Sequence, residues 1–311
     1  MKIAGNQTMN TDLLNQFKKL VRNDRSGSFL CKRRREQAFT SFLNYVSKEY
    51  HKKKISNINN KHIISYTQMR LANGVAVKTI KTDLSAIRHY LYLAGAHADI
   101  TNEAMGLHNL PKTAKLGITD DEFKRALKIA SPDIRNSLVL MSAFGLRENE
   151  VSSISNGQLL DAKSNNYLHI KGKGGRIRNI PVENQKQVEV LNLSIDNIGQ
   201  FNGVLNDRDD HFFADRSKGS VLKFKRRLSQ FWVRHQGQIA DSNRTDRVSN
   251  HDLRRSYAQH QYDRARMDGE SKSAALGIVS KNLGHGFKVK RDAVAGTQRT
   301  DIVKVYVHDK W

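Results

Sequence analysis

The sequence predicts a mostly helical protein of two domains with one small β-hairpin, and three observations support this fold class. The 311 residues are enough for about two domains, each with its own core. Apolar residues recur at helical spacing in the first third and the last third of the chain. Between these regions, two alternating stretches flank a turn rich in glycine and lysine, which is typical of a β-hairpin.

Helices are predicted throughout the N-terminal region. Three groups of apolar residues follow the helical period, so each group lies on one face of a helix. The groups are Leu13, Leu14, Phe17, Leu20 and Val21; Phe39, Phe42, Leu43, Val46 and Tyr50; and Ile80, Leu84, Ile87 and Leu91.

The helical pattern breaks near Pro111, where the stretch NLPKTAKLG is typical of a linker. The boundary between the domains therefore lies between about residues 110 and 118. We expect a helical domain at residues 1–113 and a second domain at residues 118–311.

The second domain begins with two predicted helices. Thr119 and Glu122 form a capping box, which marks the start of the first. Pro132 at a first helical position begins the second, which runs to about Phe144.

A hairpin with a lysine at its tip follows these helices. The stretches at residues 167–171 and 176–182 carry alternating apolar residues, and Gly-Lys-Gly-Gly joins them. From Val221 onward, helical patterns return and continue to the end of the chain.

The chain is strongly basic, with 53 Lys and Arg against 30 Asp and Glu and a formal net charge of +23. Such a charge favours polyanions, of which nucleic acid is the commonest inside cells, although anionic membranes and simple solubility are alternatives. Both domains share the surplus, with 19 cationic against 7 anionic residues in 1–113 and 34 against 23 in 114–311. A ligand that touches both domains is long or enclosed, which suits a duplex better than a small anion.

Basic residues cluster at three places in the N-terminal domain. Neutralising phosphates needs several cations close together, so the clusters predict contacts with a DNA backbone. A merely solvated basic face explains the third cluster equally well. The clusters are Lys32, Arg33, Arg34 and Arg35; Lys52, Lys53 and Lys54; and the helical stripe of Lys78, Lys81, Ser85 and Arg88.

Several classes of protein are not indicated. The first 20 residues lack the apolar region of a signal peptide, and no stretch approaches the length of a membrane span. The single cysteine, Cys31, permits no intrachain disulfide and no cysteine-based zinc site. No P-loop, H-E-x-x-H or G-x-S-x-G motif occurs. We expect a cytoplasmic, DNA-associated protein with no membrane partner, no cofactor and no metal.

A dispersed set of polar residues accompanies short turns in the second domain. Two arginines, a lysine and two histidines can hold the oxygens of a phosphoryl group in its transition state, and a tyrosine can supply a nucleophile. Each residue alone has a simpler structural explanation, so the hypothesis depends on the ordered set. The set is Arg147, Lys173, His251, Arg254, His285 and Tyr306.

In this order, the motifs resemble those of the tyrosine recombinases, or phage-type integrases. That family has an arginine in G-L-R-x-x-E, a hairpin lysine, H-x-L-R, L-G-H and a tyrosine in Y-x-H. The stretch VKTIKTDLSAIRHYLYLAG also resembles the end of the family's core-binding domain. The matching positions here are Gly145 to Glu150, Lys173, His251 to Arg254, Leu283 to His285, and Tyr306 to His308.

The resemblance implies a helical core-binding (SAM-like) domain followed by a tyrosine recombinase catalytic domain. It implies site-specific cleavage and rejoining of DNA through a 3′-phosphotyrosine, without metal or ATP. The implied partners are double-stranded DNA with specific recombination sites, further copies of the chain in a homotetramer, and in some systems an accessory DNA-bending protein. The expected role is integration and excision of a mobile element rather than resolution of replicon dimers.

The resemblance also implies a role for each residue. Tyr306 is the nucleophile, and Arg147 and Arg254 hold the non-bridging phosphate oxygens. Lys173 protonates the leaving 5′ oxygen. His251 assists proton transfer at the tyrosine or binds the phosphate, and His285 donates a hydrogen bond to the phosphate. We interpret Glu150 as structural.

The C-terminal spacing departs from the family pattern. The intervals from Arg254 to His285 and from His285 to Tyr306 are longer than usual, and we expect residues 286–299 to form an extended basic loop at the DNA. Only five residues follow Tyr306, whereas many relatives have a further helix there.

Two assignments have rivals within the sequence. Tyr257 and Tyr262 compete as nucleophiles, but neither has the Y-x-H context. Lys171 competes with Lys173, which is favoured because glycines flank it in the turn. A type IB topoisomerase-like nicking enzyme and a non-catalytic DNA-binding protein are the alternative functions.

Overall fold

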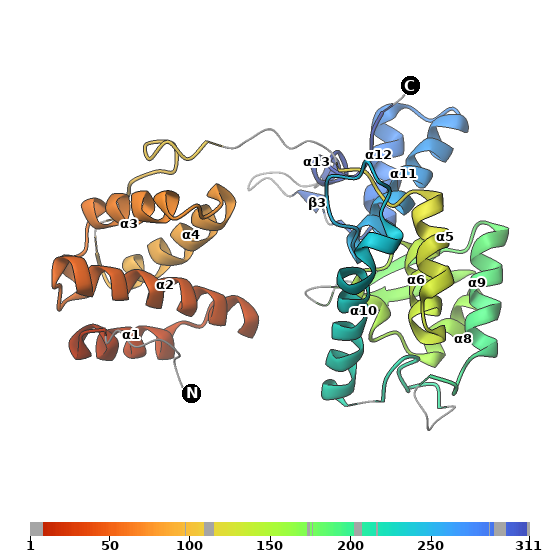
Figure 1. Cartoon of the computed structure of the whole chain (residues 1–311), viewed down its shortest axis with the longest axis horizontal. Helices are drawn as coiled ribbons and strands as arrows, with labels where there is room; N and C mark the ends of the chain where they lie inside the picture. The colour runs from red at the N-terminus through yellow and green to blue at the C-terminus, as the bar shows by residue number, and fades with distance from the viewer. Residues whose placement is uncertain are drawn as a thin grey trace. The chain divides into compact units, whose positions relative to one another are not determined.

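The computed structural model describes residues 9–96, 98–108, 115–172, 175, 177–201, 207–215, 217–285, 287–288 and 297–309. The chain divides into two compact units, Met1–Pro111 and Lys112–Trp311, which Figure 1 shows in colour by residue number. Most of the described residues are helical, as the sequence predicts. None of the helices described is both long and apolar enough to cross a membrane.

The N-terminal unit is helical and its core is aromatic. The rings of Phe17, Phe39 and Tyr90 pack against one another at centroid distances of 5.1 to 5.4 Å, and they join three of the helices. All three predicted apolar groups contribute buried residues to this core. The described helices are α1 (Thr11–Asn23), α2 (Phe29–Tyr50), α3 (Asn60–Ala72) and α4 (Val77–Leu93), with the 3-10 turn η1 (Ile55–Asn57).

The C-terminal unit has α6 in its core, and the α6 residues Leu138, Met141 and Phe144 are fully buried. Its helices are α5 (Asp120–Ile129), α6 (Pro132–Phe144), α7 (Glu148–Val151), α8 (Asn156–Asn165), α9 (Gln185–Asp196), α10 (Lys218–Ile239), α11 (Asn250–Met267), α12 (Lys272–Asn282) and α13 (Thr300–Val303). Its strands are β1 (Tyr167–Lys171), β2 (Ile177–Pro181), β3 (Phe287–Lys288) and β4 (Thr297–Gln298).

Local sequence signals explain the start of this unit. Thr119 and Glu122 form the predicted capping box, with backbone-to-side-chain hydrogen bonds of 3.0 and 3.2 Å. Pro132 occupies the first position of α6, and the helix ends at Phe144 as predicted. Gly145 then adopts a left-handed conformation (φ 59°), which glycine tolerates at a helix end.

The predicted hairpin is present as the antiparallel pair β1–β2. Leu168 pairs with Ile180, and Ile170 pairs with Arg178, so these four residues face the interior. The alternation places Ile177 outward, where 72 % of it is exposed. An arginine therefore takes an inward position that an apolar residue normally occupies.

The C-terminal region is less uniformly helical than the sequence indicates. Helical patterns were expected from Val221 to the end, yet β3 and β4 form a second antiparallel pair before the four-residue helix α13. Two-residue strands are too short to show an alternating pattern, which is why the sequence did not predict them.

Candidate active site

Arg147 lies at the N-cap of α7, three residues after the end of α6. The left-handed Gly145 creates the turn, and a Cβ there would approach the Tyr257 ring to 2.4 Å. Glycine is thus required both for the backbone conformation and for close packing. The guanidinium of Arg147 donates to Glu150 at 2.7 Å, and its side chain stays 32 % exposed.

Helix α11 supplies two members of the predicted set. Ser249 and Asp252 cap its first turn, where the Ser249 amide donates to Asp252 at 2.7 Å. His251 is exposed at this end of the helix. Arg254 lies one turn further on and is fully buried, with its guanidinium bound to the backbone carbonyls of Gly145 and Leu283.

The Leu-Gly-His motif is the C-terminal cap of α12. The His285 amide donates to Ser280 at 2.9 Å, and the Gly284 amide donates to Lys281 at 2.9 Å, which is the Schellman pattern. Gly284 has φ 67°, as this cap requires. The carbonyl of Leu283 is left to accept other donors at the negative end of the helix.

Three arginines use the Leu283 carbonyl. Arg254 donates to it at 2.5 Å, Arg178 at 3.2 Å and Arg147 at 3.5 Å. The end of α12 is therefore an anchor for cations from α7, α11 and the hairpin.

Tyr306 lies between the two histidines of the set. Its ring centroid is 5.2 Å from that of His251 and 5.8 Å from that of His285. The side chain is half-buried, and its backbone amide donates to Val303 at 2.7 Å. Segments far apart in the sequence thus meet at one place.

A clasp fixes the segment that follows Tyr306, and we use this name for the contacts of residues 307–309 with α11. Val307 is buried beside Tyr262 and Ala258 in a small apolar core. Gln259 on α11 and the backbone of His308 exchange two hydrogen bonds of 2.7 and 2.9 Å.

Asp309 completes the clasp, because it accepts from the Tyr262 hydroxyl at 2.8 Å and pairs with Lys272 at 2.5 Å.

The rival tyrosines are both unsuited to attack an external phosphate. Tyr257 is 4 % exposed and packs on Gly145. Tyr262 is fully buried, and desolvation together with Asp309 raises its pKa to about 12.

The arginines surround one buried carboxylate. Glu150 accepts from Arg147 at 2.7 Å and from Arg178 at 2.8 and 3.0 Å. Burial alone would raise the pKa of Glu150, but Arg178 and Arg147 outweigh it, so that the pKa is lowered and the carboxylate is ionised. Desolvation, followed by the charges of Arg178 and Arg147, lowers the pKa of Arg254 to about 9.

Both histidines are neutral near pH 7. Desolvation lowers the pKa of His285 to about 4, and Arg254, Arg147 and Arg178 add to this effect. The pKa of His251 is also lowered, to about 4. Desolvation of the ring by the residues packed on it is the main cause, and the charges of Arg255, Arg254 and Arg147 add to it. Neutral imidazoles can accept a proton as well as donate one, as acid–base chemistry requires.

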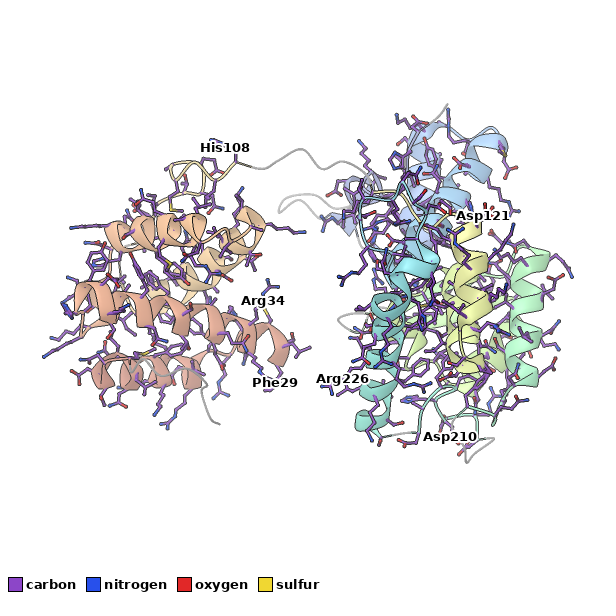
Figure 2. The ribbon with its side chains drawn as sticks, in the orientation of Figure 1. Phe29, Arg34, His108, Asp121, Asp210 and Arg226 are labelled. Atoms are coloured by element: carbon purple, nitrogen blue, oxygen red, sulfur yellow. The ribbon has the colours of Figure 1, made fainter. Side chains whose placement is uncertain are left out.

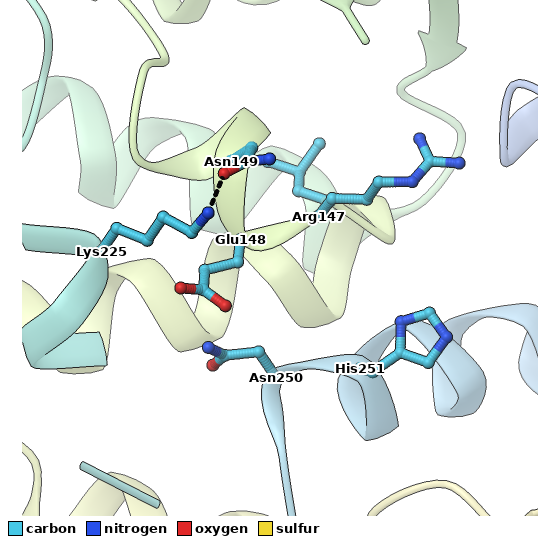
Figure 3. Close-up of a pocket in the computed structure, with 7 residues that line it drawn as sticks. Arg147, Glu148, Asn149, Lys225, Asn250 and His251 are labelled. Atoms are coloured by element: carbon cyan, nitrogen blue, oxygen red, sulfur yellow. Dashed lines mark hydrogen bonds between the residues drawn. The ribbon is translucent and has the colours of Figure 1, made fainter. Parts of the chain in front are cut away.

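A pocket of about 210 Å³ lies beside these residues (Figure 3). Arg147 and His251 lie at one side of it, and Lys225 of α10 lies at the other, where it donates to Asn149 at 2.5 Å. Asn250 also lines the pocket and accepts from the Trp232 indole at 2.5 Å. Among the described residues, no group of three or more His, Cys, Asp or Glu could hold a metal ion.

The hairpin lysine of the predicted set, Lys173, lies outside the described residues, as does most of the predicted basic loop at residues 286–299. The rival, Lys171, ends β1 and is exposed.

The N-terminal basic clusters separate into exposed residues and residues used within the unit. Arg33, Arg34, Lys53, Lys54 and Lys78 are exposed, and Figure 2 shows Arg34 near the start of α2. Because α2 has 22 residues and is about 33 Å long, the first two clusters lie at its opposite ends.

The other basic residues of these clusters are half-buried. Lys32 donates to the Asp24 carbonyl at 2.8 Å, and Arg35 bonds to Ser26 at 2.9 Å. Arg88 donates to Ile100 at 2.8 Å and to Asn102 at 3.1 Å. Arg88 therefore uses its donors within the N-terminal unit, on the loop after α4. Lys52 and Lys81 are also half-buried.

Sequence reasoning missed two residues of the site. Arg178 belongs to none of the motifs, but strand alternation places it on the same face as the apolar Ile180. An arginine rarely faces a core without a partner, so this position could have indicated a buried ion pair. Lys225 lies in a helix with many cations and gave no signal that distinguishes it from its neighbours.

Comparison with known proteins supports the assignment of the N-terminal unit. Residues 10–99 match the family model described as phage integrase, N-terminal. No curated protein is detectably similar in sequence.

Solved structures share the fold of nearly the whole chain. The crystal structure of a lambda integrase dimer bound to a COC' core site has a TM-score of 0.60 at 15% identity and covers 94% of this chain and 93% of its own. The Tn1549 transposon integrase in complex with transposon right end DNA has a TM-score of 0.61 at 12% identity, with 96% and 95% covered. A lambda integrase tetramer bound to a Holliday junction has a TM-score of 0.56 at 16% identity, with 96% and 78% covered.

The resemblance to the tyrosine recombinases that the motifs predict is thereby confirmed, since the chain has a phage integrase N-terminal domain at residues 10–99 and the fold of these integrases.

Proposed function

We propose that the protein is a site-specific DNA recombinase that cleaves and rejoins strands through a phosphotyrosine at Tyr306. The observation that carries this proposal is the position of Tyr306 between His251 and His285, at ring distances of 5.2 and 5.8 Å. Arg147 and Arg254 reach the carbonyl that precedes the Gly-His285 motif, so a nucleophile, two imidazoles and two guanidiniums converge.

The proposed step is a transesterification. The Tyr306 oxygen forms a bond to a DNA phosphorus, and the bond from that phosphorus to the 5′ oxygen breaks. The phenolic proton passes to His251, and the leaving 5′ oxygen takes up a proton, for which Lys173 is the proposed donor. An attacking 5′-hydroxyl from a second strand reverses the step and completes strand transfer.

The arginines stabilise the charge that develops on the phosphate. Arg147 is partly exposed and can meet a non-bridging oxygen directly. Arg254 is fully buried, so its contact with the phosphate requires that the groups covering it move when DNA binds. His285, which is 9 % exposed, is the proposed donor of a further hydrogen bond to the phosphate.

The DNA partner is a duplex with a specific site, and the proposed assembly is a tetramer. The net charge of +23 and the exposed Arg33, Arg34 and Lys78 support backbone contacts. Integrases of the same fold, from lambda and from the transposon Tn1549, support a role in integration and excision of a mobile element.

A nicked suicide duplex tests the proposal. A cognate duplex is first selected from random-sequence DNA by binding to the full chain, and a nick placed beside the cleavage position lets a short strand diffuse away. We expect a covalent protein–DNA adduct with the wild-type protein and none with Tyr306→Phe, at equal DNA binding. Tyr257→Phe is the matched control and should still form the adduct, because Tyr257 is a buried rival tyrosine outside the clasp and the variant keeps the ring that packs on Gly145. An adduct in Tyr306→Phe, or none in the wild-type protein, would contradict the proposal.

A further inference from the structure

Arg178 is a buried cation that none of the proposed catalytic steps uses. It lies on the inward face of β2, opposite Ile170, and its side chain is only 6 % exposed. Its guanidinium donates to Glu150 and to the Leu283 carbonyl, so we look for its role in the groups that it contacts.

Those groups are the anchors of the other two arginines. Arg178 holds Glu150 through two hydrogen bonds of 2.8 and 3.0 Å, and Glu150 in turn holds Arg147 at 2.7 Å. Arg178 also donates to Leu283 at 3.2 Å, the carbonyl to which Arg254 donates at 2.5 Å. One side chain thus contacts both acceptors on which the site arginines depend.

The packing of Arg178 adds a third contact. A Cβ built on Gly284 would lie 2.8 Å from the Arg178 Cδ, so the arginine stem covers the glycine of the Leu-Gly-His motif. Any displacement of Arg178 would disturb the cap that places His285. The same residue also fastens the strand that follows the turn bearing Lys173.

Charge explains why an arginine stands there. Three guanidiniums and one carboxylate meet in the interior, and burial of unpaired like charges is costly. Arg178 and Glu150 form a bidentate, buried pair that is neutral as a whole. The positive charge that remains belongs to Arg147 and Arg254, the two residues proposed to meet the phosphate.

We propose that Arg178 is a positioning residue of this site, which fixes Arg147 and Arg254 through Glu150 and the Leu283 carbonyl. The inference rests on the proposed function, because its consequence is measured on DNA cleavage. A merely structural role, in which Arg178 only holds the hairpin in place, predicts a loss of stability without a selective loss of cleavage.

Single-turnover cleavage of the suicide duplex at saturating protein separates the two roles. For Arg178→Met we expect DNA affinity within about threefold of wild type and cleavage slower by about 30-fold or more, since misplaced guanidiniums stabilise the transition state poorly. Arg178→Lys should be intermediate, because one ammonium can hold Glu150 but cannot keep both bonds. Arg178→Lys also serves if the methionine variant does not fold.

Arg244→Met is the matched control. The Arg244 side chain is 8 % exposed and pairs with the buried Glu122 at 2.6 Å, so its loss breaks a comparable buried ion pair. We expect a similar fall in melting temperature but cleavage within about threefold of wild type at a temperature where the protein is folded. Equal loss of cleavage in the two methionine variants, or a wild-type rate in Arg178→Met, would overturn the inference.

A second readout does not depend on activity. Arg178 is one of the cations that hold the pKa of His285 down, so Arg178→Met should raise that pKa in an NMR titration of the full chain, and Arg244→Met should not. An unchanged His285 pKa in Arg178→Met would count against the placement of Arg178. If the wild-type protein forms no adduct but the pKa moves, the proposed function fails and the placement of Arg178 stands.

Discussion

At the scale of single residues, His285 shows what the arginine cluster does to its neighbours. Its imidazole is buried, and three guanidiniums face it, so protonation is unfavourable in the folded state. The neutral ring lets the site hold these three arginines close together without adding a fourth adjacent positive charge.

This arrangement makes stability depend on pH. The folded pKa of His285 is about 4, below the unfolded value of about 6.5, so the unfolded chain binds more protons between these values. The free energy of unfolding should therefore fall as the pH drops from about 6.5 towards 4, by about 2 kcal/mol between pH 7 and pH 5 from this residue. Urea denaturation of wild type and His285→Asn across this range measures it. An equally steep fall in His285→Asn would contradict the assignment.

A second prediction at the scale of single residues concerns Gly145, where the structure requires a glycine. Gly145→Ala combines a left-handed backbone with a Cβ that would enter the Tyr257 ring, so we expect a loss of about 2 to 4 kcal/mol in the free energy of unfolding. Gly269→Ala is the control, because Gly269 is also left-handed (φ 88°) but has open space at its Cβ. That variant should lose only about 1 kcal/mol. Equal losses in denaturant titrations would show that packing against Tyr257 adds nothing.

At the scale of elements, the clasp after Tyr306 holds the proposed nucleophile on its own catalytic unit. The two hydrogen bonds between Gln259 and His308 connect this segment to α11, the helix that also carries His251 and Arg254. The clasp thereby relates the position of the tyrosine to that of the groups that act on the phosphate.

Loss of the clasp should slow cleavage without weakening DNA binding. In Gln259→Leu, Tyr306 samples more positions, and we expect single-turnover cleavage to fall about tenfold, equivalent to about 1.4 kcal/mol. Gln185→Leu removes an exposed side-chain hydrogen bond to Glu189 on α9 and serves as the control. A Gln259→Leu variant that cleaves at the wild-type rate would show that the clasp does not position Tyr306.

The elements that the sequence predicted most precisely are those with local signals. The capping box at Thr119 and the proline of α6 fixed helix starts, and alternation around the glycine turn predicted β1 and β2. Helix α8 was not predicted, because its sequence is rich in Asn, Ser and Gly, although Ser155 and Gln158 form a capping box that could have marked it.

At the scale of the whole molecule, the charge of +23 separates into surface cations and internal ones. Arg34 is exposed, whereas Arg88 makes its hydrogen bonds within the N-terminal unit. The sequence alone could not distinguish Arg34 from Arg88, because both lie on helices with an apolar face. They differ only in their neighbours in the folded unit.

This division predicts different phenotypes. Arg34→Gln should weaken DNA binding and lower the slope of log Kd against log salt by about 1, with unchanged stability. Arg88→Gln should instead lower the free energy of unfolding by about 1 to 3 kcal/mol, because three hydrogen bonds to the loop are lost. Salt-dependent binding isotherms and denaturant titrations of the two variants measure these effects. Weaker DNA binding in Arg88→Gln and lower stability in Arg34→Gln would contradict these two predictions.

The ordered motifs predicted much of the candidate site but not its support. The structure brings Tyr306, His251, His285, Arg147 and Arg254 close together, and their catalytic roles stay a prediction. Glu150 and Arg178 are 28 positions apart in the sequence and form an ion pair only in the folded core. No local sequence spacing indicates such a pair.

The identity of the linked residue tests the central claim most directly. After trapping on the suicide duplex, digestion with nuclease and trypsin should leave a nucleotide on the peptide of residues 305–310, and mass spectrometry should locate it at Tyr306. A nucleotide on a peptide bearing Tyr257 or Tyr262, or no modified peptide under conditions where the duplex is bound, would contradict the account.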